Sequence, residues 1–238
     1  FDLIDLVHLA DLREESRTLT FAAIKQSAHT QLTPWAIDDL VELAVFFLYH
    51  EVIEAGRTAE AMAELRKQLP EIDCNPSDEH LTAMLAHRAG VADRSLERKD
   101  LLGRDEPAGF NLYLLSLDFG RWLTVERRLS PLVADTMRHF VNVCLVEMRE
   151  ESDCDPLVLH QQRLDKYLAQ LLGLMSVMYS RGVATLIGMR HFRDFLAAVN
   201  LVGEGEHRRA KRICDDLWSQ MHRALGDTVP DYAFLNKY

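Results

Sequence analysis

The chain has 238 residues, of which 48% are apolar and 27% are charged. This composition is typical of a folded globular protein, excludes disordered and fibrous chains, and comes with enough length to bury a core. The 27 lysine and arginine residues against 37 aspartate and glutamate residues give a net charge of −10, which disfavours non-specific binding to nucleic acid.

Helical patterns follow one another along the chain, and strand patterns are nearly absent. The clearest helix start is Thr33-Pro34, because threonine caps a helix and proline suits its first position. The same signature recurs at Asn75-Pro76, Ser130-Pro131 and Asp155-Pro156. In chain order, we expect helices at residues 2–15, 19–30, 34–55, 58–69, 76–89, 110–129, 131–151, 156–181, 184–201 and 205–225.

These patterns predict an all-α fold. The expected architecture is an irregular bundle of nine or ten helices, or a solenoid-like array of antiparallel helical hairpins. Gly56, Gly90 and Gly182 are expected to end helices, because glycine readily takes the left-handed conformation found there. Residues 91–108 are rich in charged side chains and are expected to form a long connection or a short surface helix within one helical domain, 1–238.

A glycine followed five residues later by an alanine occurs in two segments. In residues 49–70 these are Gly56 and Ala61, and in residues 197–218 they are Gly205 and Ala210. Glycine permits a tight turn between helices, and a small residue lets the second helix approach the first closely. The segments resemble tetratricopeptide-type helical hairpins, and the resemblance implies a surface that binds proteins or peptides. Generic antiparallel helix packing explains both segments equally well.

A second internal similarity relates residues 71–80, EIDCNPSDEH, to residues 151–160, ESDCDPLVLH. If the two copies met in space, they would supply two thiolates and two imidazoles for a tetrahedral zinc ion. The Cys-x5-His spacing is not a standard zinc pattern, and a capped helix start used twice explains the similarity more simply. We therefore expect no metal and no cofactor. The alternative metal site would consist of Cys74, His80, Cys154 and His160.

Charge is distributed unevenly along the chain. Residues 1–119 carry 11 basic and 22 acidic side chains, whereas residues 120–238 carry 16 and 15. The main basic cluster lies on the last expected helix, where its members are exposed and Ile213, Leu217, Met221 and Leu225 should point inward. A solvated helix face is one reading, and a contact for an acidic partner is the other. The cluster consists of Arg208, Arg209, Lys211 and Arg212.

The sequence offers no sign of export or of membrane insertion. The longest uncharged run, residues 167–180, is shorter than the ~20 residues needed to span a bilayer. Four scattered cysteines do not form the disulfide framework of a secreted protein. We expect a cytoplasmic protein. The chain does not begin with methionine, and we leave open whether it is a fragment or a processed form of a longer protein.

Common enzyme signatures do not occur in the sequence, including GxSxG, GxxxxGK[ST], GxGxxG and HExxH. We therefore favour a non-enzymatic helical protein that acts as a regulatory or adaptor protein by binding another protein, and we leave its oligomeric state open. The alternative is an all-helical enzyme or sensor that holds a small ligand or metal in a bundle cavity. That cavity would be lined by Met175, Met178, Tyr179, Met189 and Phe192.

Overall fold

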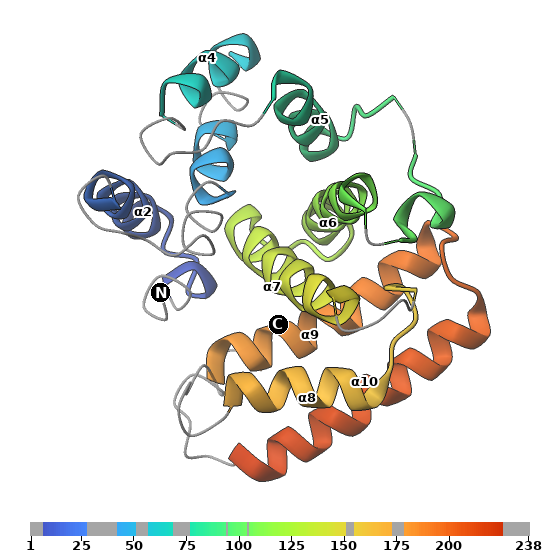
Figure 1. Ribbon diagram of the computed structural model, residues 1–238. Helices are drawn as coiled ribbons and strands as arrows, with labels where there is room; N and C mark the ends of the chain where they lie inside the picture. The colour runs from blue at the N-terminus through green and yellow to red at the C-terminus, as the bar shows by residue number, and fades with distance from the viewer. Residues whose placement is uncertain are drawn as a thin grey trace.

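A computed structural model describes residues 7–27, 42–50, 57–68, 77–93, 95–103, 105–150, 155–172 and 179–225. Throughout these ranges the regular elements are helices and no residue is in a strand, which confirms the all-α prediction (Figure 1). No helix in the described part of the chain is both long and apolar enough to cross a membrane. The helices are α2 (Arg13–Ser27), α4 (Thr58–Gln68), α5 (Asp78–Ala89), η2 (Arg98–Leu101), α6 (Glu106–Glu126), α7 (Pro131–Glu150), α8 (Gln161–Leu172), α9 (Tyr179–Ala198) and α10 (Glu204–Leu225).

Several expected helix ends are confirmed by their caps. At the start of α7, the Ser130 hydroxyl accepts a hydrogen bond from the Val133 amide at 3.3 Å. At the end of α5, Gly90 has a φ of 69° and donates its amide to the helix carbonyls. Helix α5 begins two residues later than expected, because Ser77 is its N-cap and accepts a bond from the His80 amide. The side chains of Ser77 and Ser130 and the amide of Gly90 provide partners for backbone groups that a helix end leaves without hydrogen bonds.

The prediction of one helix over residues 156–181 is wrong. The Asp155 carboxylate accepts a hydrogen bond from the Leu157 amide at 2.8 Å, which makes a turn instead of a helix cap. Helix α8 therefore begins only at Gln161, and Gly182 lies inside α9 rather than at a helix end. A Cβ atom at Gly182 would stand 3.0 Å from Leu172 Cδ2, so this glycine lets α8 and α9 approach closely.

The first two expected helices are also divided differently. Residues 7–9 are helical, a turn follows, and α2 starts at Arg13. The turn contains Asp11, whose φ of 60° lies in the left-handed region that short polar side chains tolerate. Of the expected helix at 34–55, residues 42–50 are described and are helical.

The charged segment 91–108 forms the expected connection, except at its end. Among the described residues of this segment before Asp105, the one helix is the short η2, whose Leu101 is fully buried. Helix α6 starts at Glu106, four residues before the expected position. Its N-cap is Asp105, which accepts a hydrogen bond from the Ala108 amide and is followed by Pro107 in the first turn. A proline also follows the cap of α7, but there it comes directly after Ser130, whereas Glu106 separates Pro107 from Asp105.

Helix α6 separates two hydrophobic cores. The larger core takes Leu112, Leu115 and Phe119 from α6 and is completed by residues of α7 to α10. The smaller core takes Leu114 and Leu117 from the opposite side of α6 and is completed by α2, residues 42–50, α4 and α5. Helices α6 and α7 accordingly lie in the middle of the molecule, between the N-terminal and the C-terminal helices (Figure 1).

Helices α9 and α10 form an antiparallel hairpin, the arrangement expected for residues 197–218. Ala210 is buried at their contact. The left-handed residue of the turn is Asn200, with a φ of 61°. Gly205 lies in the first turn of α10, and a Cβ atom there would meet nothing within 4 Å. The turn expected at Gly205 therefore precedes this glycine, and Gly56 of the other segment lies outside the described residues.

Candidate functional site

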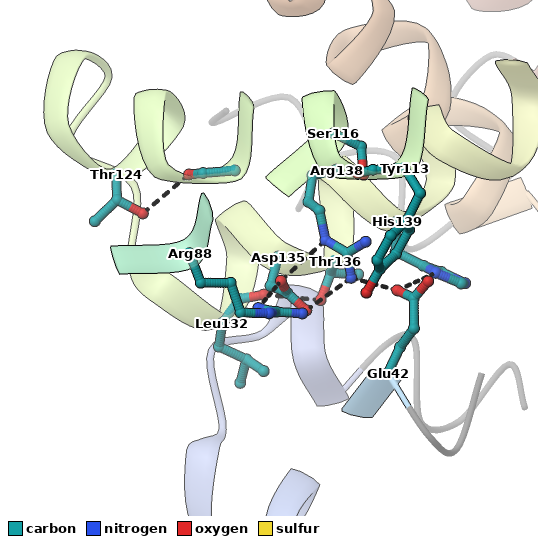
Figure 2. Close-up of polar contacts among 11 residues, drawn as sticks. Glu42, Arg88, Tyr113, Ser116, Thr124, Leu132, Asp135, Thr136, Arg138 and His139 are labelled. Carbon is teal, nitrogen blue, oxygen red and sulfur yellow. Dashed lines mark hydrogen bonds and ion pairs between the residues drawn. The ribbon is translucent and has the colours of Figure 1, made fainter. Parts of the chain in front are cut away.

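A cluster of charged side chains is buried where residues 42–50 and α5 meet α7 (Figure 2). At its centre, Arg138 is 1% exposed and donates hydrogen bonds to Glu42 and to Asp135. Arg88 reaches the same Asp135 carboxylate from α5, at 2.7 Å, and His139 Nδ1 lies 3.2 Å from the Glu42 carboxylate. We call these five residues the ionic cluster.

The guanidinium groups keep both carboxylates of the ionic cluster ionised. Burial would raise the pKa of Glu42, but Arg138 and His139 outweigh it and lower the pKa to about 2. Burial opposes ionisation of Asp135 as well, and Arg138 and Arg88 nevertheless hold its pKa well below the usual range. A carboxylate with such a low pKa is a weak proton acceptor near neutral pH. The ionic cluster is therefore suited to fixing helices in place and poorly suited to general base catalysis.

A second buried cation lies in the larger core. Arg193 is 1% exposed and donates one hydrogen bond to the Leu157 carbonyl, from α9 to the segment before α8. Burial lowers its pKa to about 10. Cys144 and Cys214 are both buried, free thiols, and burial raises the pKa of Cys214 to about 11 and that of Cys144 further. These thiols are protonated at neutral pH and are unreactive, as the position of Cys144 in an apolar helix predicts.

The accessible candidate site is a pocket of about 470 Å³ between α9 and α10. Its central anion is Asp194, which contacts Arg127 at 2.7 Å, His207 at 2.9 Å and Lys211 at 3.3 Å. Burial would raise the pKa of Asp194, but these hydrogen bonds and charges lower it. The pocket is lined by Arg127, Leu186, Ile187, Arg190, His191, Asp194, Lys211, Cys214, Asp215 and Trp218.

Of the predicted basic cluster, Lys211 lines this pocket, and the other three residues lie on the same helix outside its lining. Arg208, Arg209 and Arg212 are exposed on α10. Lys211 is 35% exposed and turns into the pocket toward Asp194, so it is not on the outer side with the others. At 100° per residue, Arg208 lies about 60° and Arg212 about 100° around the helix from Lys211, whereas Arg209 lies about 160° away, on the far side of the exposed face. Ile213, Leu217 and Met221 are buried as expected, and the Leu225 side chain lies outside the described part.

The four residues of the alternative metal site are described only in part. His80 lies in the first turn of α5, where its ring stands 4.2 Å from the Phe110 ring. His160 precedes α8, and Cys74 and Cys154 fall outside the described residues. In the described ranges, no three histidine, cysteine, aspartate or glutamate side chains are grouped to hold a metal ion. Of the residues expected to line a ligand cavity, Met189 and Phe192 are fully buried in the larger core.

Asp194, Arg127 and Arg190 are not among the site residues predicted from the sequence. Asp194 is the single carboxylate of α9, and it lies one helical turn after His191, a spacing that places both on one side of the helix. That position could have been noticed, but the contacts with α6 and α10 depend on tertiary packing. Comparisons with family models, with curated proteins and with solved structures found no match to this chain.

Proposed function

We propose that this chain is an interaction protein that binds an acidic segment of another protein on a basic face. The basic face consists of Arg208 and Arg212 on α10 and of Arg127, Arg190 and Lys211 in the adjoining pocket. The observation that carries the proposal is this continuity between an exposed cationic stripe and a pocket that contains cationic groups.

The basic face has a positive charge although the chain is acidic. Its five cations have four neighbouring carboxylates, namely Asp194, Asp215, Glu204 and the exposed Asp216, which lies one turn after Arg212. One positive charge therefore remains, in a chain whose net charge is −10. A positive patch on an acidic protein favours partners that carry a negative segment, and it accelerates their association.

The pocket also offers apolar surface to a bound segment. Trp218 and Ile187 line it beside the charged groups, and both are partly buried against the larger core. Aromatic side chains commonly anchor binding surfaces because they bury a large area. An acidic segment that carries one large apolar residue would use both the charge and the pocket.

The test is fluorescence anisotropy with a fluorescein-labelled acidic peptide that contains one phenylalanine. In about 50 mM salt, Arg208→Glu/Arg212→Glu should weaken binding roughly tenfold, and higher salt should reduce the difference. The matched control is Arg57→Glu/Lys67→Glu, which changes the charge equally at exposed positions of α4 and the residue before it. It should leave the affinity within a factor of about two, because distant exposed charges are screened.

Arg209→Glu gives a sharper control on the same helix. Since Arg209 lies on the far side of the exposed face, its reversal should weaken binding less than reversal of Arg212. Equal losses in all variants would show that the peptide responds only to net charge, and would contradict the proposed face. The same conclusion would follow if the wild-type protein did not bind the peptide.

A further inference from the structure

A groove runs between α5 and α6 on a different part of the molecule. Its volume is about 890 Å³, and it is bounded by both helices and by the segment that follows α5. That segment leads away to η2 before the chain returns to α6 (Figure 1). The groove is lined by Asp78, Glu79, His80, Thr82, Ala83, Ala86, His87, Ala92, Asp93, Leu96, Glu106, Pro107, Phe110, Asn111 and Leu114.

The floor of this α5–α6 groove is apolar. Phe110 and Leu96 are partly buried and pack against the smaller core beneath. On α5, Ala83 and Ala86 line the groove one turn apart. Small side chains at this spacing let the backbone of another helix come close, as in packed helix pairs. The His80 ring, 4.2 Å from the Phe110 ring, extends the aromatic surface at one end.

The rim of the groove is acidic. Four carboxylate side chains line it, and no lysine or arginine is among its described lining residues. One carboxylate, Asp78, forms an ion pair with Arg66 of α4 at 2.7 Å. The other three, Glu79, Asp93 and Glu106, are exposed. A bound segment would therefore meet a negative potential around an apolar floor.

We propose that the α5–α6 groove binds a basic amphipathic helix of a partner protein. On α5 the lining residues run from Asp78 to His87, which at 1.5 Å per residue corresponds to about 14 Å, or roughly three helical turns of a partner. Apolar side chains on one face of that helix would contact Phe110 and Ala83, and flanking lysine or arginine would meet the acidic rim. This is the helix-in-groove mode of recognition.

The groove and the basic face select partners of opposite charge. The groove would repel the acidic segment proposed for α10, because the rim carboxylates have the same sign as that segment. The two sites share no lining residue. The second proposal is therefore independent of the first, and together they would let the chain hold a basic and an acidic partner at once.

The test uses a labelled helical peptide of about 14 residues that contains leucine, lysine and alanine, with the leucines on one face. Its isomer has the same composition, with the leucines spread around the helix. The groove variant is Thr82→Arg/Asp93→Arg, which introduces bulk and positive charge at exposed positions of the rim. We expect the amphipathic peptide to bind the wild-type protein at least about tenfold more tightly than it binds this variant, and more tightly than the isomer binds the wild type.

A matched control exists on α2. Thr18, like Thr82, is exposed and donates its hydroxyl to the carbonyl four residues earlier. Thr18→Arg/Glu15→Arg thus changes the charge equally on a helix outside the groove, and it should bind the peptide within about twofold of the wild type. Equal losses in the two variants, equal binding of the two isomers, or no binding at about 100 μM would overturn the proposal.

A second measurement uses the unmodified protein. A benzophenone placed among the leucines of the amphipathic peptide should cross-link, on illumination, to the α5 and α6 segments that line the groove. Mass spectrometry of the digested adduct identifies the attached segment. Cross-links confined to α9 and α10 would overturn the proposal even if both peptides bound with the expected affinities.

Discussion

Arg138 links charged groups from two helices at the interior of the protein. Its guanidinium is almost fully buried and bonds to the carboxylates of Glu42 and Asp135. Removing one partner of a buried ion pair leaves the other charge in a poor solvent, which costs more than the pair itself contributes. The free energy of unfolding should therefore respond strongly to changes at this residue.

The variant Arg138→Met keeps an unbranched chain in place of the aliphatic part of the side chain and removes the guanidinium charge. We expect it to lower the free energy of unfolding by about 3–5 kcal/mol, because two carboxylates lose a buried partner. Urea denaturation measures the change. The exposed pair of Arg57 and Glu60, at 2.6 Å, provides the control, since Arg57→Met should cost no more than about 1 kcal/mol. Similar losses in the two variants would contradict the structural role of the ionic cluster.

His8 makes the stability of the protein depend on pH. It is 2% exposed, and its Nε2 has no hydrogen-bond partner among the described residues. Burial lowers its pKa from 6.5 to about 4. Between these values the unfolded chain binds a proton that the folded chain does not, so the free energy of unfolding falls as pH decreases.

We expect the wild-type protein to lose about 2 kcal/mol of stability between pH 7 and pH 5 through this residue. Replacement His8→Phe keeps an aromatic ring next to Phe47, whose centroid is 6.3 Å from that of His8, and removes the titrating group. Urea denaturation of the variant should show a much smaller loss over the same interval. If the variant lost as much stability as the wild type, a group other than His8 would be responsible for the pH dependence.

The sequence could not show which side chains of the candidate sites contact one another. Helical periodicity placed Arg208 and Arg212 on an exposed face, and the structure agrees. It could not pair Glu42 with Arg138, which are 96 residues apart, since helical spacing relates only near neighbours. The side chain of Lys211 was misplaced for the same reason, because Asp194 attracts it from a different helix.

At the scale of elements, two glycines distinguish close helix packing from an open surface. Gly188 lies in α9, where a Cβ atom would stand 2.8 Å from Val141 Cγ2 and 3.3 Å from the Met137 carbonyl oxygen of α7. A Cβ atom at Gly205, in the first turn of α10, would meet no atom within 4 Å. Gly188 therefore tests how tightly α7 and α9 are packed, and Gly205 is the open reference position.

We expect Gly188→Ala to destabilise the protein by about 1–2 kcal/mol, because overpacking outweighs the higher helix propensity of alanine. Gly205→Ala should instead stabilise it by about 0.4–1 kcal/mol, since alanine restricts the unfolded chain and fits the open position. Thermal and urea denaturation check both signs. Stabilisation by both substitutions would show that α7 and α9 have room between them.

The pattern of a capping residue followed by proline predicted one helix start correctly and another wrongly. Ser130-Pro131 begins α7 as predicted, and its hydroxyl bonds to the helix amide of Val133. Asp155-Pro156 has the same form, but the Asp155 carboxylate accepts a hydrogen bond from the Leu157 amide. The same carboxylate forms an ion pair with Arg98 of the segment between α5 and α6, at 2.6 Å. A tertiary ion pair and a local turn thus compete with the cap, and the two-residue pattern does not contain that information.

At the scale of the whole molecule, α6 contributes to both cores. Its residues Leu112 and Leu115 belong to the larger core, and Leu114 and Leu117 belong to the smaller one. Because neither core is complete without this helix, the cores should unfold together. We therefore expect the chain to unfold as a single cooperative unit.

The expected result is one urea transition, with the same midpoint by far-UV circular dichroism and by tryptophan fluorescence. Trp122 and Trp218 both pack against the larger core, and Trp35 lies outside the described residues. In a Trp35→Phe background, fluorescence therefore reports on the larger core, whereas circular dichroism reports on all helices. A fluorescence midpoint clearly above the circular dichroism midpoint would show that the smaller core unfolds first, and that the chain contains two folding units.

The buried charges also bear on how the chain selects one arrangement of its helices during folding. If α7 docked one turn, about 5.4 Å, away from its position, its leucines and valines would still find apolar neighbours. Arg138 and Asp135 would then be buried without Glu42 and Arg88, at a cost of several kcal/mol. Apolar contacts alone tolerate such a slip, whereas paired charges do not. We expect misdocked states to be higher in free energy because of these pairs, which would leave fewer competing compact states on the path to the native fold.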